Sequence, residues 1–137
     1  MQIHLIIINT DALVEILDRQ SKIGQQLVEK IQKSNDGFAI TALTFMTVLH
    51  GFTKLQKNIP PINLLQICDF TKKDAQKAAE LQLDLEKREK IVNKTSIMIA
   101  AIALNKSASL CTLDRKFYTL KEQGLKLFLD EIFINQM

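Results

Sequence analysis

The sequence predicts an α/β fold, a three-layer α/β/α domain built around a central, mainly parallel sheet. Short apolar runs rich in β-branched residues, such as Ile3–Ile8, alternate with longer segments of helical periodicity. These runs are apolar without polar alternation, as expected of strands that are covered on both faces. The alternation continues along the chain without a repeat or a dividing linker, so we expect one domain over residues 1–137.

Length and composition agree with a single globular domain. The chain has 137 residues, 47% hydrophobic and 24% charged, enough to close one core. Its net charge of +3 permits a nucleic-acid partner but does not indicate one. No apolar stretch approaches the roughly 20 residues that span a bilayer, and no basic segment precedes the first apolar run. We therefore expect neither membrane association nor a signal peptide.

The two cysteines, Cys68 and Cys111, both lie inside apolar segments and show no metal-ligand spacing. Free cysteine is among the residues most often found buried. We expect two buried, reduced thiols, which is typical of a cytoplasmic protein.

The first half of the chain reads as strand, two helices, strand and helix. A polar residue before an apolar stripe marks each helix start, and Ser34–Gly37 forms a turn. The expected elements are a strand at Ile3–Ile8, a helix capped by Asn9 or Thr10, a helix at Ser21–Lys33, a buried strand at Phe38–Ile40 and a helix at Thr41–Leu55.

The second half starts after Pro60-Pro61, since proline interrupts regular structure. Thr71 and Asp74 form a capping box that opens a long polar helix. The segment Thr95–Leu104 is apolar almost all round, which predicts a central helix. The other expected elements are strands at Leu64–Phe70, Ser109–Thr112 and Leu125–Leu129, and a short helix at Arg115–Gln123 ended by Gly124.

Polar residues follow several of the predicted strands. Asn9-Thr10-Asp11 comes directly after the first strand, Thr41–Thr44 leads from a strand into a helix, and Asp114 follows Thr112. Open α/β sheets bind their ligands beyond the carboxyl ends of their strands. We therefore expect these polar residues to gather at one edge of the sheet.

Four segments in this order resemble the PIN domain, in particular the small VapC-type toxin ribonucleases. The resemblance covers nearly the whole chain. The segments are the turn Asn9-Thr10-Asp11, the run Thr41–Thr44 with Leu49-His50-Gly51 after it, Ile99–Leu104, and Cys111–Phe117. The resemblance implies a PIN-like three-layer fold.

The resemblance also implies a metal site. In that family, carboxylates at four positions hold Mg²⁺ or Mn²⁺ for the hydrolysis of RNA phosphodiesters. The equivalent positions here are Asn9, Thr47, Ser96 and Asp114, and only Asp114 is acidic. These hard cations need anionic oxygen ligands to lower the pKa of bound water and to steady the scissile phosphate. We therefore predict a degenerate acidic active site.

Asp11 leaves two interpretations open. It takes the third place of the strand-turn motif, where the family often has a small polar residue that helps to bind the metal or its waters. In the first interpretation, Asp11 stabilises the positive end of its helix by about 0.3–1 kcal/mol, and Asp114 caps the helix that starts at Arg115. In the second, Asp11, Asn9 and Asp114 form a thinned metal site that fills only when an RNA phosphate adds ligands.

Two functions follow from these interpretations. The first is a PIN-domain protein that is inactive or impaired and acts by binding RNA or a protein partner. The alternative is a weak Mg²⁺- or Mn²⁺-dependent endoribonuclease, the toxin of a toxin–antitoxin pair. We expect either no cofactor or weakly bound Mg²⁺ or Mn²⁺. The resemblance further implies an antitoxin-like protein partner and a homodimer.

Overall fold

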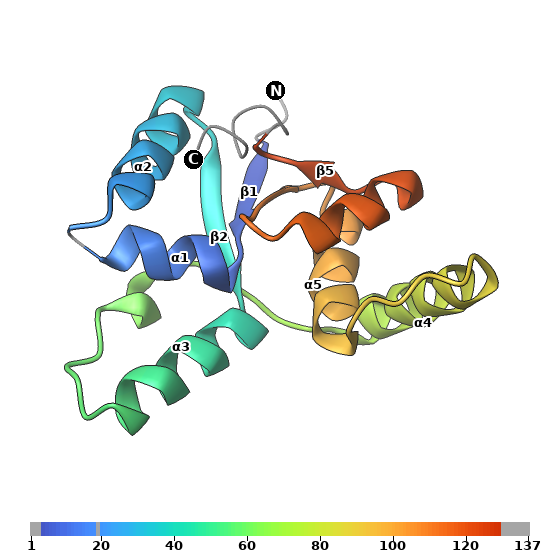
Figure 1. The fold of residues 1–137 in the computed structure, drawn as a ribbon, viewed down its shortest axis with the longest axis horizontal. Coiled ribbons are helices and arrows are strands. Elements are labelled where there is room, and N and C mark those ends of the chain that lie inside the picture. The colour runs from blue at the N-terminus through green and yellow to red at the C-terminus, as the bar shows by residue number, and fades with distance from the viewer. Residues whose placement is uncertain (1–3, 19, 130–137) are drawn as a thin grey trace.

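A five-stranded parallel sheet forms the centre of the protein in the computed structural model, which describes residues 4–18 and 20–129 (Figure 1). The strand order is β3-β2-β1-β4-β5, and every pairing between neighbours is parallel. The strands are β1 (Leu5–Ile8), β2 (Gly37–Thr41), β3 (Ile67–Cys68), β4 (Ser109–Cys111) and β5 (Lys126–Leu127). The predicted parallel sheet is confirmed.

Helices cover both faces of this sheet and complete three layers. Along β1, Ile6 and Ile8 pack into the core beneath α1, α2 and α3, whereas Ile7 packs into the core beneath α4 and α5. Figure 1 shows these two groups of helices on opposite sides of the strands. The helices are α1 (Thr10–Leu17), α2 (Lys22–Ser34), α3 (Ala42–Lys54), α4 (Lys72–Lys87) and α5 (Lys94–Asn105), with 3₁₀ segments η1 (Ile62–Leu64) and η2 (Arg115–Gln123).

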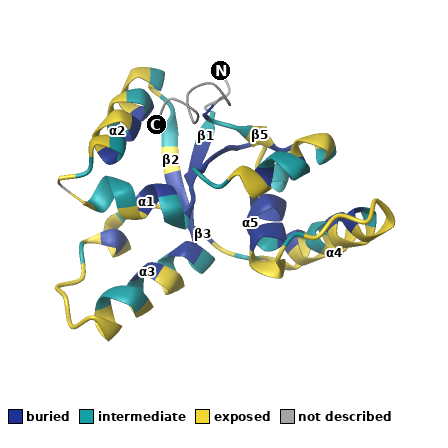
Figure 2. Ribbon diagram, in the orientation of Figure 1, coloured by how far each residue is buried: buried dark blue, intermediate teal, exposed yellow. Residues whose placement is uncertain are grey.

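The helix α5 lies against the sheet as the sequence predicted. Most of its residues between Ser96 and Ala103 are buried, and Figure 2 shows this helix in the dark blue of buried residues. Within residues 4–18 and 20–129, no helix is both long enough and apolar enough to span a membrane.

The start of α4 confirms the predicted capping box. The Thr71 hydroxyl oxygen accepts a bond from the Asp74 amide at 3.2 Å, and the Asp74 carboxylate accepts one from the Thr71 amide at 2.9 Å. Two amides that lack helical partners are satisfied in this way. The Asp74 side chain also accepts a bond from the side-chain Nδ2 of Asn105 at 2.8 Å, which ties the start of α4 to the end of α5.

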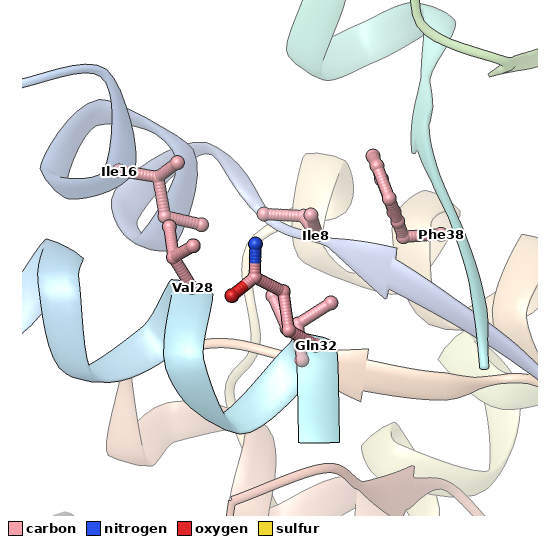
Figure 3. Close-up of a pocket in the computed structure, with 6 residues that line it drawn as sticks. Ile8, Ile16, Val28, Gln32 and Phe38 are labelled. Atoms are coloured by element: carbon pink, nitrogen blue, oxygen red, sulfur yellow. The ribbon is translucent and has the colours of Figure 1, made fainter. Parts of the chain in front are cut away.

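Predictions about three strands were wrong, and the last of these strands, expected at Leu125–Leu129, spans only Lys126–Leu127. The strand expected at Leu64–Phe70 shrinks to Ile67–Cys68, because the 3₁₀ turn after Pro61 includes Leu64 and only two residues pair with β2. Phe38 was expected to be buried, yet 44% of it is exposed. Phe38 lines an open apolar pocket together with residues of α1 and α2, so the space beside its ring is not filled (Figure 3).

Candidate functional site

The first and fourth strands bring the candidate residues together at the carboxyl edge of the sheet. Beyond β1, the Asn9 amide donates to the Cys111 carbonyl oxygen at 2.9 Å and continues the pairing of β1 with β4. This bond places Asn9 beside Thr112, which is the next residue after β4. Asn9 is 7% exposed and Thr112 is 2% exposed, so both side chains lie inside the protein.

Thr112 is the centre of a hydrogen-bond network at this edge. Its hydroxyl donates to the Asp11 carboxylate, with distances of 2.8 Å to Oδ2 and 3.1 Å to Oδ1. The same oxygen accepts bonds from Asn9 Nδ2 and from the Asp114 amide, each at 3.2 Å. We call Asn9, Asp11, Thr112 and Asp114 the Thr112 network.

Asn9 occupies the capping position of α1, but its side chain does not cap the helix, contrary to the sequence prediction. Its Nδ2 donates to Thr112, and the Asn9 Oδ1 atom is buried without a hydrogen-bond partner. If the Asn9 side-chain amide were turned the other way, its Oδ1 would face the Thr112 hydroxyl oxygen, and the proton of that hydroxyl is already donated to Asp11. Thr10, the other predicted cap, donates instead to the Thr44 hydroxyl at 3.0 Å.

Asp11 joins the start of α1 to the segment after β4. Its carboxylate accepts a bond from the Ala12 amide at 2.7 Å and one from the Leu113 amide at 3.1 Å, in addition to the Thr112 hydroxyl. Burial raises the pKa of Asp11, the three hydrogen bonds oppose that rise, and the nearby charge of Asp114 adds to it. The contact with Ala12 agrees with an acid at a helix start, and the contacts with Thr112 and Leu113 add a link across the sheet.

Asp114 caps η2, as the first interpretation of this residue predicted. Its side chain accepts a bond from the Lys116 amide at 2.9 Å. The apolar face of η2 is anchored by Phe117 and Leu120, which are buried. The Thr112 hydroxyl contacts both the Asp11 carboxylate and the Asp114 backbone amide, so the two acidic residues of the predicted site are linked through one side chain.

The structure does not join the other two family-equivalent positions to the Thr112 network. Thr47 is exposed on α3, and its hydroxyl donates to the Leu43 carbonyl oxygen of the same helix at 3.0 Å. Ser96 is 8% exposed near the start of α5, where its amide donates to Asn93 Oδ1 at 2.8 Å. Among the described residues, no hydrogen bond connects either side chain to Asp11 or Asp114.

The donor set of the Thr112 network does not suit a resident Mg²⁺. Both carboxylate oxygens of Asp11 already accept protein hydrogen bonds, and one oxygen of Asp114 accepts the Lys116 amide. The remaining acceptors are the neutral Asn9 Oδ1 and the second oxygen of Asp114. Mg²⁺ requires near-octahedral oxygen coordination with anionic ligands and loses its waters reluctantly. Asp11 and Asp114, whose oxygens already accept protein hydrogen bonds, can therefore replace few of the water ligands that Mg²⁺ would lose on binding.

Thr112 is the residue that the sequence interpretation missed as the organiser of the site. The sequence places it between a strand and Asp114, but its partner Asp11 lies 101 positions earlier in the chain. A second pair of threonines lies at the end of β2 and the start of α3, where the Thr41 hydroxyl oxygen accepts a bond from the Thr44 backbone amide at 3.1 Å. A pattern of neighbouring residues cannot reveal bonds of such long sequence separation.

Comparison with known proteins identifies the fold. The sequence matches no family model and no curated protein. Among solved structures, it is similar to a chain of VapBC2 from Rickettsia felis bound to a DNA fragment from their promoter, with a TM-score of 0.74 and 22% identity over 90% of this chain and 96% of that one. A chain of VapBC-1 from nontypeable Haemophilus influenzae gives 0.74 and 14%, and one of FitAcB from Neisseria gonorrhoeae gives 0.71 and 19%, each with the same coverage of 90% and 96%.

These neighbours are VapC toxin components of VapBC systems. The fold of this chain is that of a VapC-like PIN domain, as the motifs predicted.

Proposed function

We propose that this chain is a VapC-like protein whose metal-dependent nuclease chemistry is lost or impaired and that it acts by binding. The observation that carries the proposal is the Thr112 network. Asp11 is committed to bonds with Thr112, Ala12 and Leu113, and Asp114 caps η2, so the two acids serve the fold. The family-equivalent positions Asn9, Thr47 and Ser96 carry no charge, which leaves little to hold a divalent cation.

An antitoxin-like protein is the partner that we favour, with RNA as the other candidate. The neighbours from Rickettsia felis, Salmonella typhimurium and Klebsiella pneumoniae were solved as VapBC or toxin–antitoxin complexes, two of them on DNA. The shared fold supports the transfer of such a partner to this chain. We further propose a cytoplasmic homodimer, the arrangement expected from the resemblance to VapC proteins.

The decisive experiment is an RNA-cleavage assay on the purified protein with Mg²⁺ or Mn²⁺. The proposal expects no cleavage above background. Asp114→Ala is the test variant, and Glu80→Ala, an exposed acid on α4, is the matched control. Cleavage that Asp114→Ala abolishes and Glu80→Ala preserves would contradict the proposal.

A weak Mg²⁺- or Mn²⁺-dependent endoribonuclease is the second candidate. It is favoured by the shared contact of Asp11 and Asp114 with the Thr112 hydroxyl and by the buried Asn9 Oδ1, an acceptor without a hydrogen-bond partner among the described residues. It expects Mn²⁺ binding by calorimetry at millimolar concentration or tighter with RNA present. Asp11→Asn removes the charge but keeps a polar side chain of the same shape, so it should abolish that binding. If the wild-type protein shows no binding with RNA present, this second candidate is rejected.

The placement of the four site positions can be tested by gain of function. The triple substitution Asn9→Asp, Thr47→Glu and Ser96→Asp adds three carboxylates to Asp114. If these positions converge as in the family, the variant should bind Mn²⁺ in calorimetry. A folded triple variant that binds no Mn²⁺ would show that at least one position has been assigned wrongly.

A further inference from the structure

An apolar hollow lies where α4 ends and α5 begins. Its volume is about 190 Å³. Leu85 of α4 and Ile97 of α5 are 1% and 4% exposed and form the inner side of the hollow. Figure 1 shows α4 extending away from the sheet, and Figure 2 shows the segment after it largely in the yellow of exposed residues. The rest of the lining comes from Gln82, Glu86, Lys90, Ile91 and Val92.

Ile91 protrudes at the rim of this hollow. It is 100% exposed, more than any other large apolar side chain among the described residues. Backbone hydrogen bonds fix the segment that carries it. The Lys90 amide donates to the Leu85 carbonyl oxygen at 2.9 Å. The Glu89 amide donates to the Glu86 carbonyl oxygen at 3.0 Å. The protein therefore holds an apolar side chain in solvent, where its contact with water is unfavourable.

Four charged side chains near the hollow pair with one another within the chain. Arg88 Nη1 lies 2.7 Å from Glu122 Oε2, and Arg88 Nε lies 3.1 Å from Asp84 Oδ2. Lys90 Nζ lies 3.6 Å from Glu122 Oε2. These two bases and two acids compensate one another, so none of them is needed to attract a partner.

Four further charged residues line the hollow or flank its lining in the sequence, outside those ion pairs. Glu86 and Glu89 are acidic, Lys87 and Lys94 are basic, and all four are exposed. This end of the hairpin thus carries no net charge, although the whole chain carries +3. Two copies that meet here avoid the repulsion between like charges, and an acid of one copy can face a base of the other.

A surface with both a protruding apolar side chain and an apolar hollow can pair with a copy of itself. In a two-fold dimer each copy presents the same patch, so Ile91 of one chain can enter the hollow of the other and the reverse. An apolar cavity of about 150 Å³ in another protein binds benzene, which has six carbon atoms. A hollow of about 190 Å³ therefore has room for an isoleucine side chain, which has four.

We propose that this end of the α4–α5 hairpin is a contact between two copies of the chain, in which Ile91 of each copy fills the hollow of the other. The inference rests on the homodimer of the proposed function and names its surface. Because Ile91 is buried twice in each such dimer, Ile91→Ala should raise the dissociation constant by at least about 100-fold.

The test is sedimentation velocity on the full chain over a concentration series. Wild type should form a dimer as its concentration rises, whereas Ile91→Asp should stay a monomer because it would place a carboxylate in the apolar hollow. The matched control is Leu83→Asp, since Leu83 is 54% exposed on α4 and does not line the hollow. The control should dimerise as wild type does. Circular dichroism checks that both variants, which replace exposed side chains, keep the fold.

Two results would overturn the proposal. If Ile91→Asp dimerises as tightly as wild type, this surface is not the contact, although the homodimer itself stands. If wild type is a monomer throughout the series, the surface and the homodimer are both rejected. The RNA-cleavage assay tests the loss of nuclease chemistry separately, so the two failures can be told apart.

A charge variant gives an independent measurement of the same contact. Glu86→Lys combined with Glu89→Lys makes the rim of the hollow positive, so two copies should repel and the dimer should be lost at low salt. At about 1 M salt exposed charges are screened beyond roughly 3 Å, so the dimer of this double variant should return there. Ile91→Ala, which lacks the apolar contact, should stay weakened at both salt concentrations. A double variant that dimerises like wild type at low salt would contradict the proposal.

Discussion

Replacement of Thr112 by valine should strongly destabilise the protein, because one hydroxyl holds three groups of the site. Valine has nearly the same shape, so Thr112→Val leaves no large cavity. It removes the donor to Asp11 and the acceptor for Asn9 Nδ2 and for the Asp114 amide. Thr112 is 2% exposed, so water cannot readily take the place of the hydroxyl.

The size of the effect follows from these contacts. A hydrogen bond to a charged group contributes about 1.5–3 kcal/mol, and a buried donor left without a partner costs about 1–3 kcal/mol. The two effects share the same atoms and are not additive, so we expect a loss of about 3 kcal/mol in the free energy of unfolding. That is a large fraction of the roughly 5–15 kcal/mol that stabilises a typical domain.

Urea denaturation followed by circular dichroism measures this loss. The matched control is Thr53→Val on α3, where an exposed hydroxyl donates to the Leu49 carbonyl oxygen at 2.8 Å. The control should change the free energy of unfolding by no more than about 0.5 kcal/mol. If Thr112→Val costs no more than Thr53→Val, the Thr112 network does not hold the site together.

Three further predictions concern pH, packing and thiol chemistry. Burial raises the pKa of Asp11 above 3.8, so its contribution to stability is complete below about pH 3.8 and is lost as pH rises through the folded pKa. In urea denaturation, the free energy of unfolding of wild type should therefore fall relative to that of Asp11→Asn as the pH rises from 3.8 through the folded pKa. If it rises instead, the hydrogen bonds to the Asp11 carboxylate outweigh the effect of burial. A Cβ at Gly24 would lie 2.0 Å from the Glu15 carbonyl oxygen, so Gly24→Ala should cost about 3 kcal/mol. At Gly51 an added Cβ would meet nothing within 4 Å beyond its chain neighbours and its own helix backbone, so Gly51→Ala should by contrast stabilise α3 by about 0.5–1 kcal/mol. Burial raises the pKa of the Cys111 thiol to about 12, so iodoacetamide at pH 8 should modify it only after unfolding, and rapid labelling of the folded protein would contradict its burial.

Local features of this fold were predictable because they depend on neighbouring residues. The capping box of Thr71 and Asp74, the cap by Asp114 and the end of η2 at Gly124 each involve residues a few positions apart. The alternation of strands and helices likewise predicted the parallel sheet. Predictions failed where neighbours in space decided the outcome. Phe38 is exposed because the helices on its face of the sheet leave an open pocket beside its ring.

The sequence by itself determined the fold class and the identity of the residues at the carboxyl edge of the sheet. Asn9, Asp11 and Asp114 were named from their positions after strands. Only the tertiary structure decided what these residues do, because β1 and β4 pair across more than 100 positions and bring Thr112 between Asn9 and Asp11. That contact makes Asp11 a link between α1 and the segment after β4, and the Asn9 Oδ1 atom is left buried without a hydrogen-bond partner among the described residues. Burial and hydrogen-bond geometry, which arise only on folding, fix the chemistry available at this edge.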